Sequence, residues 1–78
     1  MQIYGYQKDV DTLINLKEIS LQCTLEELDD IISFLTKSRE KHVNVIEKTS
    51  MCHSHFRDWN SEWKQGNPDI IVVTTCRK

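Results

Sequence analysis

Two histidines separated by one residue, His53 and His55, are the pair whose spacing suits metal coordination. Residues two apart on a strand point to the same side, so both imidazoles could reach one ion. Cys52 then faces the opposite side, and a zinc ion would need Cys76, a carboxylate or a water molecule as a further ligand. A pair of this kind is more often two hydrogen-bonded histidines at a sheet edge. We therefore expect no metal and no cofactor, and metal binding by His53 and His55 is an alternative.

The sequence lacks the residue arrangements that are typical of an enzyme. Nucleophilic catalysis needs a cysteine or serine beside a base in a concave site, but Cys52 and His53 diverge as neighbours on a strand. The chain has two glycines and contains no glycine-rich phosphate loop. No carboxylate pair stands out, and a domain of this size has little volume for a substrate cleft. We expect a protein that is not an enzyme.

The segment after these histidines has the residue types of a protein interface. Residues 57–63 contain two tryptophans, one arginine and two acidic residues in a predicted loop. Tryptophan and arginine are enriched where binding energy concentrates in interfaces. Tryptophans also cap the core of a small domain, so we expect at least one in the core and at least one at an interface. The predicted partner-binding residues are Asp58, Trp59, Glu62, Trp63, His53, His55 and Arg57.

The length and composition of the chain limit its class. Its 78 residues have room for one domain, residues 1–78, and 38 % of them are hydrophobic, as in a globular protein. The net charge is −2 with acidic and basic residues mixed, so we expect no direct binding to nucleic acid, which normally requires a basic patch. No apolar run approaches the ~20 residues of a membrane span, and the N-terminus has no secretory signal pattern. We expect a cytoplasmic protein that does not enter a membrane, with its three cysteines reduced and Cys23 and Cys76 buried.

The clearest structural signal is one amphipathic helix that begins after Thr24. Thr24 and Glu27 have the spacing of a capping box, in which each side chain bonds a free backbone N–H at the helix start. Acidic residues crowd the first turns and basic residues the later part, which complements the helix dipole. The helix could run to Glu47 or end near His42. Its apolar stripe is formed by Leu25, Leu28, Ile31, Ile32 and Leu35, followed by Val43 and Ile46.

Four strands are predicted around this helix. Residues 2–6 and 13–23 form the first two, as an antiparallel hairpin, with a bulge near Lys17 and Glu18 to reconcile the alternation of apolar residues. Residues 53–57 and 70–76 form the last two, separated by a turn at residues 65–68. The predicted fold class is α+β: a small, mostly antiparallel sheet of order ββαββ with one amphipathic helix packed on one face.

The last strand is apolar on both faces. Ile71 and Val73 point away from the side that the helix covers, because side chains alternate along a strand. Either a loop covers them, which we expect, or they lie under a partner or a second copy of the chain.

The order of these short motifs resembles a family of small bacterial immunity proteins, those of the immunity protein 32 type. The resemblance covers nearly the whole chain. It rests on residues 3–6 (Ile-Tyr-Gly-Tyr), 16–21 (Leu-Lys-Glu-Ile-Ser-Leu), 24–28 (Thr-Leu-Glu-Glu-Leu), 34–35 (Phe-Leu), 53–58 (His-Ser-His-Phe-Arg-Asp) and 69–73 (Asp-Ile-Ile-Val-Val).

The resemblance implies a cytoplasmic protein that binds a cognate toxin domain of a polymorphic toxin system and neutralises it by stoichiometric occlusion. Mild acidity would suit a basic toxin through complementary charge. Two alternatives come from the residues themselves. One is a homodimeric accessory or regulatory protein that pairs through the uncovered sheet face, and the other is a small metal-binding protein that uses His53 and His55.

Overall fold

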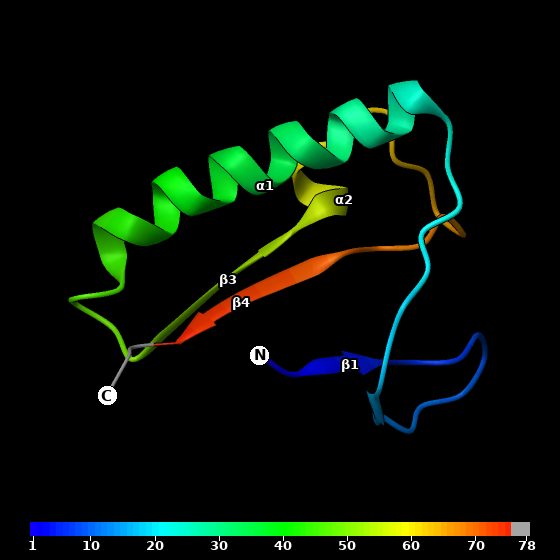
Figure 1. The fold of residues 1–78 in the computed structure, drawn as a ribbon, viewed down its shortest axis with the longest axis horizontal. Coiled ribbons are helices and arrows are strands. Elements are labelled where there is room, and N and C mark those ends of the chain that lie inside the picture. Colours follow the sequence, from blue (N-terminus) through cyan, green and yellow to red (C-terminus); the bar gives the residue numbers. More distant parts are fainter. Residues whose placement is uncertain (76–78) are drawn as a thin grey trace.

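The longest element is helix α1 (Leu25–Val45), and local sequence specifies where it begins. The computed structural model describes residues 1–75 (Figure 1). Both halves of the capping box are present. Thr24 Oγ1 accepts a hydrogen bond from the Glu27 N–H at 3.1 Å, and Glu27 Oε1 accepts one from the Thr24 N–H at 2.8 Å. The helix ends at Val45, between the two ends that the sequence left open.

Helix α1 lies across one face of an antiparallel pair, β3 (Met51–His55) and β4 (Ile71–Thr75), as Figure 1 shows. The pairs run from Met51 opposite Thr75 to His55 opposite Ile71. Alternation sends Ser54, Val72 and Thr74 toward the helix, where they are partly buried. The two faces predicted for the last strand are confirmed as far as Thr75, and Cys76 lies outside the described residues.

The first two strands form a separate antiparallel hairpin, β1 (Ile3–Gly5) and β2 (Ile14–Leu16). The predicted pairing is confirmed, but a second strand that reaches Cys23 is wrong. Strand β1 offers only three residues for pairing, and within residues 1–75 no strand pairs with residues 17–23, which are irregular. The expected burial of Cys23 is also wrong, because Cys23 is exposed in this segment. The α+β class is confirmed, and the order ββαββ is matched apart from the added α2. Residues 1–75 form two two-stranded sheets in place of the one sheet that was expected.

A short helix that the sequence did not predict, α2 (Phe56–Trp59), follows β3 directly. Strand β3 begins at Met51, two residues earlier than expected. It ends at His55, because α2 begins at Phe56. Phe56 and Trp59 of α2 pack around Phe34 of α1, with ring centroids 5.3 and 6.1 Å from the Phe34 ring. Phe34 is 1 % exposed and is the one fully buried apolar side chain among residues 1–75, so this aromatic cluster is the centre of the core.

Large apolar side chains remain exposed on both sides of the helix–sheet unit. Ile71 and Val73 are 51 % and 52 % exposed, so the expected loop cover over this outer face is wrong. The segment directly after β3 instead forms α2, whose Phe56 and Trp59 pack against Phe34 of α1. The helices described between residues 1 and 75 include none with the length and hydropathy needed to cross a bilayer.

Candidate protein-binding site

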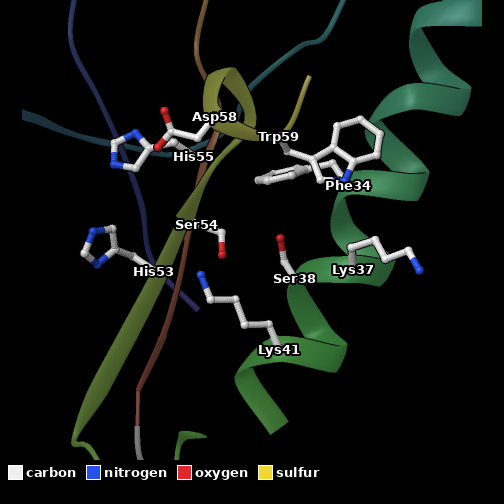
Figure 2. A pocket seen from close by; sticks show the side chains of 9 residues that line it. All are labelled: Phe34, Lys37, Ser38, Lys41, His53, Ser54, His55, Asp58 and Trp59. Carbon is white, nitrogen blue, oxygen red and sulfur yellow. The ribbon is translucent and has the colours of Figure 1, made fainter. Parts of the chain in front are cut away.

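A cleft of about 440 Å³ opens between α1 and the edge of β3 (Figure 2). Three elements build it. Helix α1 contributes one side, β3 contributes the other, and α2 closes one end. The lining residues are Phe34, Lys37, Ser38, Lys41, His53, Ser54, His55, Asp58 and Trp59.

The helical repeat explains the α1 side of the cleft. Residues three and four apart on a helix lie above one another, so Phe34, Ser38 and Lys41 line up along the face that looks at β3. Figure 2 shows the Lys41 side chain extending across the opening toward His53 and Ser54, whereas Lys37 points away from them. The Ser38 hydroxyl points into the cleft. The helix therefore directs the Lys41 side chain and the Ser38 hydroxyl into the same space.

Below the cleft, His42 joins the helix to both strands. Its Nδ1 lies 2.7 Å from Thr74 Oγ1 and its Nε2 lies 2.9 Å from Ser54 Oγ. The side chain is 2 % exposed, and burial lowers the pKa of His42, with the positive charge of Lys41 and the nearby His53 acting in the same direction. A neutral imidazole has one donor and one acceptor, and a hydroxyl can serve either, so both ring nitrogens are satisfied. This bridge holds Ser54 at the cleft floor.

Asp69 fixes the end of β3 and the start of α2. Its Oδ2 lies 2.8 Å from His55 Nδ1, and its Oδ1 accepts hydrogen bonds from the N–H groups of Arg57 and Ile70, both at 2.9 Å. Burial raises the pKa of the Asp69 carboxyl, but the hydrogen bonds from His55 and from the two backbone groups outweigh it, so the pKa is lowered. A carboxylate only accepts hydrogen bonds, so the proton in this bond lies on His55 Nδ1.

The two histidines of the proposed metal pair lie side by side. Their ring centroids are 5.5 Å apart and the rings are nearly perpendicular. His55 Nδ1 is hydrogen-bonded to the Asp69 carboxylate. Residues 1–75 contain no group of three or more potential ligands that could hold an ion, and Cys76, which could have completed the set, lies outside the described residues.

The structure brings four of the seven predicted partner-binding residues into the cleft: His53, His55, Asp58 and Trp59. Arg57 lies beside it, with its Nε 3.6 Å from Asp58 Oδ1. Glu62 and Trp63 do not line the cleft, and Trp63 Nε1 donates to the Pro68 carbonyl at 2.9 Å.

The two tryptophans are not divided into one in the core and one at the surface of the cleft. Trp59 packs against Phe34 and Phe56 yet is 39 % exposed, so one tryptophan serves the core and forms a wall of the cleft. Trp63 is partly buried and stabilises the turn before β4.

Sequence reasoning missed the α1 side of the cleft and the His42 bridge. A signal for both was present, because Phe34, Ser38 and His42 follow at intervals of four and mark the helix face toward the sheet. His42, at one of those positions, is a buried polar residue whose ring is hydrogen-bonded to both strands.

A second groove, of about 300 Å³, lies on the other side of α1 beside β4. It is lined chiefly by apolar side chains of the helix and of Val72, with Arg39 as the charged residue at its rim. Its residues are Leu35, Arg39, His42, Val43, Ile46, Val72 and Thr74.

Comparisons with known proteins found no matching family model, no similar curated protein and no similar solved structure.

Proposed function

We propose that this chain is an immunity protein: a cytoplasmic, non-enzymatic inhibitor that binds a cognate toxin domain and occludes its active site or substrate surface. The observation that supports this most is how little apolar surface the chain buries by itself. Phe34 is the one fully buried apolar side chain among the described residues, while large apolar residues are exposed along α1 and on β3 and β4. Exposed apolar surface of this extent is typical of a protein that binds another protein.

The distribution of this surface fits a partner of macromolecular size. The cleft and the apolar groove lie on opposite sides of α1, and the outer face of the sheet adds Ile71 and Val73. A standard interface buries about 800 Å² per partner, which a domain of this size can present. The resemblance to immunity proteins supplies the class of partner, and Trp59 in the wall of the cleft is of a residue type enriched at interface centres.

The experiment is to purify the tagged protein from its native cell and to identify and size what is bound. The proposal expects one protein in equimolar amount that arrests growth when expressed alone and does not when this chain is expressed with it. Trp59→Ala, checked for folding by circular dichroism, should weaken the complex by about tenfold or more. Tyr6→Ala, which removes an exposed aromatic ring from the hairpin, is the matched control and should leave affinity unchanged. An unbound chain that protects against no toxin would contradict the proposal.

A second candidate, a homodimeric accessory protein, is favoured by one specific observation. Ile71, Val73 and Met51 are exposed together on the face of the sheet that α1 does not cover. Pairing of two such faces would bury them. A stable dimer of the isolated chain that Val73→Lys converts to a monomer would support this candidate, whereas a monomer leaves the face open for another protein.

A further inference from the structure

Within residues 1–75, β3 pairs with β4 on one side, and no strand pairs with its other edge, beside the cleft. The Phe56 N–H donates to the Ile70 carbonyl at 2.8 Å, which makes Phe56 and Ile70 a hydrogen-bonded pair next to the ladder. Such pairs alternate in an antiparallel ladder, so Ser54 opposite Val72 is the next one. The backbone N–H and C=O of His53 are therefore directed away from β4, toward the open edge.

The space beside that edge has the place and size for one more strand. Neighbouring strands lie about 4.8 Å apart, and the cleft of about 440 Å³ occupies this position between β3 and α1. A segment that pairs with β3 there alternates its side chains in step with those of the strand. The residue opposite Ser54 then points inward, toward Ser38 and Lys41, and its neighbours point outward beside His53.

The charges around this position favour an acidic side chain. Lys41 extends into the cleft, whereas the His53 ring lies on the side of β3 away from α1 (Figure 2). Ser38 is 5 % exposed, and its hydroxyl points to the same space. Asp58 is the acidic residue that lines the cleft, and Arg57 Nε lies 3.6 Å from its carboxylate. The cleft thus has a cationic centre, although the whole protein carries a net charge of −2.

We propose that this cleft binds an extended segment of the partner protein, which adds to the edge of β3 and places an acidic side chain against Lys41 and Ser38. This inference rests on the proposed function and names the surface and the chemistry of the partner. Backbone hydrogen bonds to His53 supply affinity, and the inward side chain supplies specificity, as in other proteins that bind peptides by strand addition. Trp59 forms the apolar wall for a neighbouring residue of the segment.

The first test reverses the central charge. Lys41→Glu should weaken binding of the captured partner by at least about tenfold in calorimetry, because it places two like charges together. Lys41→Arg should retain most of the affinity. Lys17→Glu makes the same charge change at an exposed position outside the cleft, and should alter affinity by less than about twofold.

The second test addresses the backbone edge. His53→Pro removes the outward N–H, which proline lacks, and should weaken binding far more than His53→Ala, which removes the side chain alone. In the unmodified protein, hydrogen exchange of the His53 amide should slow on binding, because that amide gains a partner.

The outcomes separate this inference from the proposed function. Suppose that a toxin binds Lys41→Glu and His53→Pro as tightly as the unmodified chain, and that hydrogen exchange of the His53 amide does not slow on binding. This result would overturn the inference that the cleft binds the partner, but it would leave the proposed immunity function intact. A chain that captures no toxin would overturn both.

Discussion

At the scale of single residues, His42 carries the connection between helix and sheet. Its ring hydrogen-bonds one side chain on each strand, Ser54 and Thr74, from a position that is almost fully buried. We expect His42→Ala to lower the free energy of unfolding by about 2 kcal/mol, because it leaves two hydroxyls without their partner and removes buried packing. Urea unfolding measures this. His53→Ala, at an exposed histidine, is the control and should change stability by less than about 0.5 kcal/mol.

The same histidine makes stability depend on pH. Its pKa is lowered in the folded protein by burial first and then by Lys41 and His53, so the unfolded chain takes up a proton at a higher pH than the folded one. The stabilisation is complete above the unfolded value of about 6.5 and declines as the pH falls below it. Urea midpoints at pH 7.5 and 5.5 should differ more for the unmodified protein than for His42→Gln, which keeps hydrogen-bonding capacity but does not titrate.

Asp69 does not interfere with that comparison. Its pKa is lowered, so its contribution is present above about 3.9 and is lost only as the pH falls further, through its folded value. An equal pH dependence in the unmodified protein and in His42→Gln would show that other groups cause it.

At the scale of elements, the start of α1 depends on two neighbouring side chains. Thr24→Ala removes the side-chain acceptor of the capping box and should lower the free energy of unfolding by about 1 kcal/mol. Thr36→Ala is a matched control, because the Thr36 hydroxyl bonds the Ile32 carbonyl inside the helix at 3.0 Å, a contact that does not stabilise a helix. Denaturation curves of the two variants should therefore differ, and equal curves would contradict a capping role for Thr24.

The elements that could be predicted are those whose causes are local. Thr24 and Glu27 are three residues apart, and the pairing of β1 with β2 joins neighbours in the chain. The end of β3 could not be predicted, because the carboxylate that caps the Arg57 N–H comes from Asp69, twelve residues later. The excess length of the second predicted strand has a related cause, since alternation within residues 13–23 says nothing about whether a partner strand exists.

The candidate site was likewise predicted only in part from the sequence. Residue types predicted the β3 and α2 side, where His53, His55, Asp58 and Trp59 meet. Lys41 and Ser38 were missed because a helix surface contains many polar residues, and only the position of β3 shows which of them face a cleft.

At the scale of the whole molecule, the hairpin and the helix–sheet unit differ in how strongly tertiary contacts stabilise them. Helix α1 contacts β3, β4 and α2, whereas β1 and β2 contact chiefly each other. In Figure 1 the hairpin lies apart from the helix and is joined to it by the irregular segment that precedes α1. A two-stranded hairpin on its own is marginally stable in water. The tertiary contacts of the chain therefore stabilise the helix–sheet unit more than the hairpin.

This difference predicts two levels of protection from hydrogen exchange. Amides in β3, β4 and the middle of α1 should open only by unfolding of the whole unit, whereas those in β1 and β2 should open locally and exchange at least about 100-fold faster. Leu16→Ala, which removes the side chain that packs against Gly5, should speed exchange in the hairpin without shifting the melting temperature of the rest. Equal protection in both parts would mean that they unfold together. A toxin bound in the cleft should slow exchange in β3 and leave the hairpin amides unchanged, because the cleft and the hairpin share no residues.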